Sequence, residues 1–198
     1  LLDEGKLAFS GESGEAIDRY LQSVFDESEA VAVFSEDAIK IMSIESIRVL
    51  DHNDNPAISL NRARPFRIEI KYQVREPIND ACVSMTLSTR DNSVRICNSR
   101  DTEMSTDGFI ERQPGRYTSV VEFPGGILNN GAYYARVGLY SPRTSTIDSR
   151  NSPAFELIDH GDLANYQTAL PESKRGMLAF PLKWSTELVD SSRDQVAL

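Results

Sequence analysis

The sequence predicts an all-β fold, an antiparallel β-sandwich with one short helix near the N-terminus. Apolar and polar residues alternate with a period of two in several short stretches between residues 38 and 160, as in strands with one buried face. Turn-forming residues separate these stretches, and no helical segment lies between them to connect parallel strands. Of the 198 residues 40% are hydrophobic, which is enough for one well-filled core with flanking segments.

The N-terminal part is predicted to be a strand pair, a helix and a linker. Residues 1–12 form two short strands around a turn. A helix follows from an N-cap at Ser13 to about Phe25, because apolar residues recur behind Ser13 at helical spacing. Residues 26–37 are acidic at both ends and are predicted to be a linker, with a short element of its own at Ala30–Phe34.

The clearest predicted strand is Phe66–Arg75, in which five apolar residues alternate with five polar ones. In Tyr133–Tyr140 the alternation places Tyr133, Ala135, Val137 and Leu139 inward. The other predicted strands are Ser46–Asp51, Ala81–Thr89, Val94–Asn98, Gly115–Phe123 and Ala154–Ile158. The sandwich is therefore expected to occupy residues 38–160, and the less regular residues 161–198 form a C-terminal extension.

Charge and composition argue against several partners. The formal net charge is −9, from 30 acidic and 21 basic residues, without a run of Lys and Arg. Nucleic acids and anionic membranes are bound by clustered basic residues, so neither is an expected partner. Cys82 and Cys97 have no metal-binding spacing and are predicted to be small buried or half-buried side chains. No apolar stretch approaches the length of a membrane span and no signal peptide is visible, which favours the cytoplasm.

No constellation of residues predicts an enzyme, a metal site or a cofactor site. His52 and His160 both lie in turn-like sequence and are expected to be solvated loop residues. Nucleophile-elbow, zinc-helix and phosphate-loop motifs are absent. A carboxylate pair for glycoside hydrolysis stays open, but with 30 acidic residues a suitable pair arises by chance. Calcium at Asp51–Asn55 is also open, although turn formation explains these side chains more simply.

The candidate site is the outward face of two strands. Alternation places Ser84, Thr86 and Ser88 outward on one strand, with Arg90 at its end, and Tyr134, Arg136 and Tyr140 outward on another. Aromatic rings can stack on a pyranose, and hydroxyl and guanidinium groups can bond its hydroxyls or carboxylates. This face therefore predicts carbohydrate binding, whereas the plain alternative is an ordinary solvated face. Trp184, the single tryptophan, is a further candidate, although burial in a core or interface suits it as well.

Two stretches resemble a known family, and their order is the specific part. Residues 1–21, LLDEGKLAFSGESGEAIDRYL, resemble the closing segment of the nucleotide-binding domains of polysaccharide-export ABC transporters. The sandwich after it is similar to the C-terminal domain of Wzt-type exporters. Its matching features are Ile44 to Pro56, the strand from Phe66 to Tyr72, the turn with Leu128, Gly131 and Tyr133, and the strand near Phe155.

The resemblance implies a fold, a function and a setting. The fold would be an immunoglobulin-like or jelly-roll sandwich that often forms a homodimer. Residues 1–25 would end an ABC nucleotide-binding domain, and 38–160 would bind the finished O-antigen polysaccharide, at its non-reducing end, before export. The domain would be cytoplasmic and peripheral to the inner membrane, held by the transmembrane permease of the exporter in lipopolysaccharide biosynthesis.

The resemblance also leaves a second function open. The ATPase motifs of the family are absent from this chain, so it is not expected to be an enzyme, although its full-length parent would be an ABC ATPase. The alternative is a structural module that dimerises the exporter's ATPase subunits without contacting the glycan.

Overall fold

A computed structural model describes residues 2–3, 6–7, 9–11, 27–103, 110–141, 145–161 and 176–179. The predicted helix Ser13–Phe25 and Trp184 lie outside these residues. The described elements, in chain order, are β1 (Leu2–Asp3), β2 (Lys6–Leu7), η1 (Glu27–Ala30, a single 3₁₀ turn), β3 (Val31–Val33), β4 (Met42–Leu50), β5 (Ser59–Asn61), β6 (Phe66–Val74), β7 (Ile78–Thr89), β8 (Arg95–Arg100), β9 (Ile110–Arg112), β10 (Gly115–Phe123), β11 (Gly131–Ser141), β12 (Ser145–Asn151) and β13 (Phe155–Ile158).

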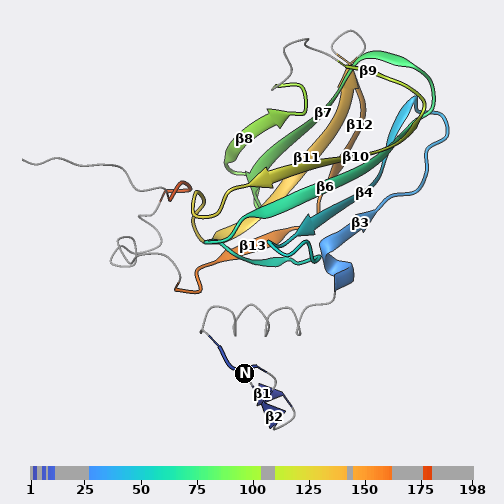
Figure 1. Ribbon diagram of the computed structural model, residues 1–198. Coiled ribbons are helices and arrows are strands. Elements are labelled where there is room, and N and C mark those ends of the chain that lie inside the picture. Colours follow the sequence, from blue (N-terminus) through green and yellow to red (C-terminus); the bar gives the residue numbers. More distant parts are fainter. Residues whose placement is uncertain are drawn as a thin grey trace, which may run out of the picture.

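Two sheets pack face to face and confirm the predicted all-β sandwich (Figure 1). One is four-stranded, in the order β10-β6-β4-β3. The other is seven-stranded, with β5-β13-β11-β7-β8 as its main path, β12 beside β11 and β9 beside β7. Strands β12 and β13 share one edge of β11, and β8 and β9 share one edge of β7. Separately, β1 and β2 form the predicted antiparallel strand pair.

The core lies between the two sheets and follows the predicted alternation. Tyr133, Ala135, Val137 and Leu139 of β11 are all at most 1% exposed, as expected for inward positions. Phe66 of β6 stacks on Phe123 of the neighbouring strand β10 with ring centroids 4.7 Å apart, and across the core its ring lies 5.3 Å from that of Phe155 on β13. Burying each large apolar side chain of this kind stabilises the fold by about 1.5–3 kcal/mol. The core residues contributed by the facing strands β4, β6, β7 and β11 therefore hold the two sheets together.

Several elements differ from the sequence prediction. Strands β5, β9 and β12 were not predicted. The strand pairing is antiparallel except for β13 and β5, which run parallel with Glu156 opposite Ser59, so the sandwich is not wholly antiparallel. The structure also has η1 and β3 within the predicted linker 26–37, at the place of the short element expected at Ala30–Phe34.

The expectations for the histidines, the Asp51 turn and the cysteines have different outcomes. His160 is only 8% exposed, so its prediction as a solvated residue is wrong, whereas His52 lies half-buried in a turn. Asp51 Oδ1 accepts hydrogen bonds from the N–H groups of Asn53 and Asn55, at 2.8 and 2.9 Å, which is the turn chemistry expected of this segment. Cys82 is buried and Cys97 half-buried, both as free thiols, as predicted.

A short part of the C-terminal extension adds to the sandwich. Leu178 pairs with Leu128 in an antiparallel bridge, and Ala179, fully buried, donates its N–H to Ile127 O at 2.9 Å. The N–H of Asn129 donates to Met177 O at 3.0 Å. Residues 176–179 thus extend the backbone hydrogen bonding at the 127–129 turn.

Candidate functional site

The pairing of β7 with β11 brings most of the predicted site residues onto one surface. Its antiparallel register sets Ser88 opposite Tyr134, Thr86 opposite Arg136, and Cys82 opposite Tyr140. Ser88 is itself only 3% exposed, so its prediction as an accessible site residue is wrong. Paired residues of this kind project from the same face of a sheet. Their inward neighbours are buried in the core, so this is the outward face of the seven-stranded sheet, which we call the β7–β11 face. Ser84 belongs to it opposite Gly138.

Strands β8 and β12 widen the β7–β11 face with residues that sequence reasoning missed. On the β8 side, Arg100 lies opposite Ser84 and Asn98 opposite Thr86. On the β12 side, Ser149 lies opposite Gly138 and Asn151 opposite Arg136. Arg95 joins the face opposite Ser88. Rows of hydroxyl, amide and guanidinium groups therefore cross four adjacent strands.

Hydrogen bonds across the strands order several of these side chains. Asn98 Nδ2 donates to Thr86 Oγ1 at 2.7 Å, and Ser84 Oγ donates to Gly138 O at 3.3 Å. Arg136 Nε donates to Ser149 Oγ at 3.1 Å. No further hydrogen bond from the Arg136 guanidinium reaches a residue that the structure describes.

Tyr140 and Arg100 form a stacked pair at one end of the β7–β11 face. The guanidinium carbon of Arg100 lies 5.4 Å from the ring centroid of Tyr140, which is the geometry of a cation–π contact. Burial and the neighbouring Cys82 thiol raise the pKa of Tyr140 to about 12. Its phenol therefore stays neutral at physiological pH, and its ring supports the Arg100 guanidinium.

The opposite end of the face carries an open cavity beside the β7–β8 turn. The cavity has a volume of about 330 Å³, and its lining includes Arg90, Asn92, Tyr134 and Asn151. Tyr134 OH donates to Asn92 Oδ1 at 2.8 Å, which fixes the ring against the turn. The structure thus places two predicted site residues, Arg90 and Tyr134, around one cavity.

The turn beside this cavity is held by Asp91. Its Oδ1 accepts hydrogen bonds from Thr89 Oγ1 at 2.6 Å and from Ser93 N and Oγ at 3.1 and 2.8 Å. These bonds lower the pKa of Asp91 to about 2, and the bond from Thr89 has the largest effect. Asn92 takes the left-handed conformation with φ 59°, which Asn tolerates better than most residues. The turn is therefore a defined wall of the cavity.

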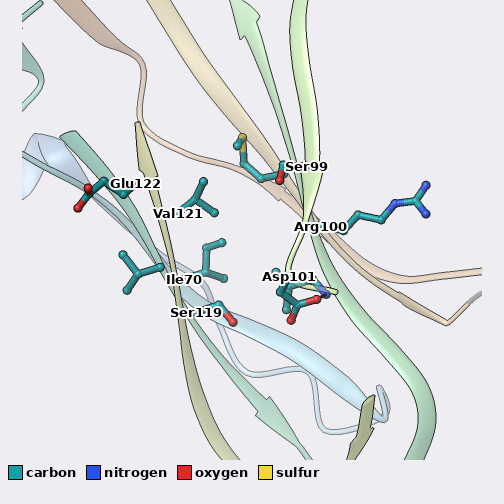
Figure 2. Close-up of a pocket in the computed structure, with 10 residues that line it drawn as sticks. Ile70, Ser99, Arg100, Asp101, Ser119, Val121 and Glu122 are labelled. Atoms are coloured by element: carbon teal, nitrogen blue, oxygen red, sulfur yellow. Dashed lines mark hydrogen bonds between the residues drawn. The ribbon is translucent and has the colours of Figure 1, made fainter. Parts of the chain in front are cut away.

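A second cavity, of about 270 Å³, opens at the side of the sandwich between β8 and β10. Its floor is formed by core residues such as Met85 and Val121, and Ser99, Asp101 and Ser119 add polar groups. Figure 2 shows the Arg100 side chain directed away from the other residues of this cavity. The Arg100 guanidinium instead reaches Tyr140, so the charge belongs to the β7–β11 face.

The outward face of the four-stranded sheet has a different character. Its arginines are paired with carboxylates: Arg48 with Glu69 at 2.8 Å, Arg67 with Glu122 at 2.8 Å and Arg116 with Glu45 at 3.0 Å. Such partly exposed pairs are typical of a solvated surface. The contrast between the two faces singles out the β7–β11 face as the candidate site.

The described residues show neither a metal cluster nor a membrane span. No three His, Cys, Asp or Glu side chains among them are grouped so as to hold a metal ion. In the same part of the chain, no helix has the length and apolarity that crossing a bilayer requires.

Comparison with known proteins decides the family. The sequence model of the Wzt C-terminal domain matches residues 40–161, which is more than half of the chain. The chain belongs to the Wzt C-terminal domain family. Its fold also matches a crystal structure of the C-terminal domain of Wzt, with a TM-score of 0.55 and 13% sequence identity over 75% of this chain and 85% of that one.

The family assignment makes this Wzt-type chain a C-terminal domain of a polysaccharide ABC transporter, as its sequence resemblance implied. Weaker structural similarities extend to a Niemann-Pick type C2 protein from the Japanese carpenter ant, with a TM-score of 0.44 and 10% identity over 63% of this chain and 100% of that one. A β-glucosidase from Erythrobacter marinus gives 0.39 and 10% over 64% and 18%. No curated protein sequence matches the chain.

Proposed function

We propose that this Wzt C-terminal domain is a non-catalytic carbohydrate-binding module that holds polysaccharide on the β7–β11 face. In the exporter it would recognise the finished O-antigen chain, at its non-reducing end, before transport. The observation that supports this is the composition of the face. Hydroxyl and amide side chains from the three strands β7, β8 and β12 lie beside the stretch of β11 between its aromatic residues Tyr134 and Tyr140.

These groups match what a pyranose presents. Aromatic side chains pack against the apolar side of a sugar ring, while hydroxyl and amide groups exchange hydrogen bonds with its rim. At Gly138 no side chain rises from the sheet, whereas its neighbours in the same row are Ser84 and Ser149. The Ser84 hydroxyl lies beside Gly138, 3.0 Å from where a Cβ would stand, so a sugar ring above Gly138 would meet this hydroxyl rather than a larger side chain.

Calorimetric titration with the polysaccharide made by the same cells tests the proposal. We expect saturable binding in the micromolar range, equivalent to about 8 kcal/mol. Tyr134→Ala and Arg136→Ala should weaken binding, whereas Gln73→Ala on the four-stranded sheet should not. The absence of saturable binding by the unaltered chain would contradict the proposal.

The alternative is a module that joins two exporter ATPase subunits without touching glycan. The observation that favours it is the edge of the four-stranded sheet at β3. There, Val33 is 76% exposed and β3 pairs on one side only among the described strands. In the connection from β3 to β4, Ile39 and Ile41 are 96% and 42% exposed. An open strand edge with exposed apolar residues can pair with a second copy.

Light scattering distinguishes this alternative. If it holds, the chain is a dimer, Ile39→Glu shifts it toward monomer, and export persists when Tyr134 and Arg136 are both replaced by Ala. A monomer at every concentration measured would eliminate it.

A further inference from the structure

The β7–β11 face carries arginines without acidic partners. Arg95, Arg100 and Arg136 project from it, and Arg90 lines the cavity at its end. All four are exposed, and no described carboxylate forms an ion pair with any of them. Of the other described arginines, every one except Arg64 has a carboxylate partner. The unpaired arginines are therefore concentrated on the proposed site.

The acidic residues nearest to this face are engaged elsewhere. Asp101 pairs with Arg112 and accepts the N–H of Val83 at 3.0 Å. Glu103 accepts a hydrogen bond from Ser99 Oγ at 2.8 Å. Asp91 accepts the hydrogen bonds of its turn from Thr89 and Ser93. On β12 the inward Asp148 binds Lys40 on the core side of the sheet. Among the described residues, none of these carboxylates forms an ion pair with any of the four arginines.

This distribution is unusual for the chain's charge. The whole sequence has a net charge of −9, yet the outward positions of β7 from Cys82 to Ser88, and those of the described strands β8, β11 and β12, include no Asp or Glu. Like charges on one face repel one another, and an anionic ligand would remove that repulsion. Guanidinium groups also bind carboxylates and phosphates through two parallel hydrogen bonds.

The arginines flank the hydroxyl rows. Arg136 projects from β11 on one side of β7, and Arg100 projects from β8 on the other. Stacking on Tyr140 orients Arg100, and the bond from Nε to Ser149 orients Arg136. Both guanidiniums thus border the surface around Ser84, Thr86 and Gly138 where a sugar would lie.

We infer that the ligand of the β7–β11 face is an acidic polysaccharide, whose carboxylate or phosphate groups are bound by Arg100 and Arg136. This inference rests on the proposed function and adds the chemical class of the glycan to it. Nucleic acid and anionic phospholipid fit less well, because they present long runs of closely spaced charge, whereas Arg100 and Arg136 are two separate cations on opposite sides of β7.

The experiment uses the whole chain and three forms of one probe. The probe is the polysaccharide isolated from the cells that make this protein, either untreated, with its carboxyl groups reduced to alcohols, or with its phosphate esters cleaved. We expect binding of the untreated form to weaken at least about tenfold after one of the two treatments, because a hydrogen bond to a charged group contributes that much. Loss on carboxyl reduction identifies carboxylates, and loss on ester cleavage identifies phosphates.

Matched variants connect the effect to the arginines. Arg100→Gln and Arg136→Gln should each weaken binding of the untreated polysaccharide about tenfold and make it less sensitive to salt. Arg116→Gln, on the opposite sheet, should change neither. Because the treatments of the polysaccharide alter only the ligand, they remain decisive if a variant fails to fold.

The outcomes separate the two proposals. No binding of the untreated polysaccharide overturns the proposed function. Equal binding of all three forms leaves that function standing and overturns the acidic ligand. Single-stranded DNA and phosphatidylglycerol vesicles are titrated in the same way. Binding of either that is as tight as that of the polysaccharide and depends on Arg136 would overturn the assignment to a glycan.

Discussion

The carboxylate of Asp148 on β12 accepts a hydrogen bond from the backbone N–H of Ile44 on β4, with Oδ2 and N 2.9 Å apart. This bond joins the two sheets of the sandwich, at the point where the register of β4 shifts between Ile44 and Ser46. The other oxygen of Asp148 binds Lys40 Nζ at 2.9 Å, and this hydrogen bond raises the pKa of Lys40. The buried carboxylate thus satisfies an N–H that the shifted ladder would leave without a partner.

Replacing Asp148 should therefore destabilise the fold. Asp148→Asn keeps the shape but removes the charge that faces Lys40 and Arg150, and we expect a loss of about 2–4 kcal/mol in the free energy of unfolding. Urea denaturation followed by circular dichroism measures it. Glu45→Gln, which removes the exposed pair with Arg116, serves as control and should change stability by no more than about 0.5 kcal/mol. Similar losses in the two variants would show that Asp148 has no special role.

Gly125 is predicted to be intolerant of any side chain. A Cβ at this position would lie 2.2 Å from Ala63 O and 2.6 Å from Ala63 C, so the turn after β10 could not keep its backbone contact. We expect Gly125→Ala to lower the unfolding free energy by about 2–4 kcal/mol. At Gly115 the nearest atom to a Cβ would be 3.8 Å away, so Gly115→Ala should leave the unfolding free energy nearly unchanged. Urea denaturation of both variants measures the difference.

The ring of Tyr140, rather than its hydroxyl, should matter for binding. Tyr140→Phe keeps the surface on which Arg100 stacks, and we expect polysaccharide affinity within about twofold of the original. Tyr140→Leu removes the aromatic face and should weaken binding about three- to tenfold. Calorimetry gives the affinities, and near-ultraviolet circular dichroism verifies folding. Equal loss in both variants would instead assign the role to the phenol hydroxyl.

The β7–β8 turn should respond to acid through Asp91. Its pKa is lowered from 3.8 to about 2 in the folded chain, so its stabilising effect is complete above the unfolded pKa and is lost as pH falls toward the folded one. Carbon-detected NMR should show the Asp91 carboxyl titrating at about 2, with faster amide exchange in the turn over the same range. Thr89→Val removes the main hydrogen bond and should move the titration toward 3.8. An unchanged midpoint would contradict this cause.

Sequence alternation predicted those strands whose inward side is apolar. The strand predicted at Phe66–Arg75 is β6, one residue shorter, and its inward residues such as Ile68 and Ile70 have no exposed surface. Strand β12 escaped prediction since its inward positions hold Asp148 and Arg150, which read as loop residues. Their charges are satisfied by Lys40 and by the ring of Phe34 beneath Arg150. Those partners come from distant parts of the chain, so no local pattern reveals them.

The candidate site was predictable to the same extent. Alternation within β7 and β11 placed Thr86 and Arg136 outward, and the register sets them side by side. Arg100 and Ser149 were missed because their membership of the face depends on which strands pair with β7 and β11. Strand order is a property of the whole fold, whereas alternation is local. That the arginines of the face lack carboxylate partners depends on all the ion pairs of the described residues, which no local pattern reveals.

The parallel pair of β5 and β13 has a consequence for folding kinetics. Ser59 meets Glu156 and Asn61 meets Ile158, so this contact closes a loop that includes nearly the whole sandwich. Pairings this distant along the chain form late and place all-β domains among slow folders, on a scale of about milliseconds to seconds. A growing chain on the ribosome cannot complete the seven-stranded sheet until Ile158 has emerged. During synthesis β5 therefore cannot form its parallel pairing until β13 has been made.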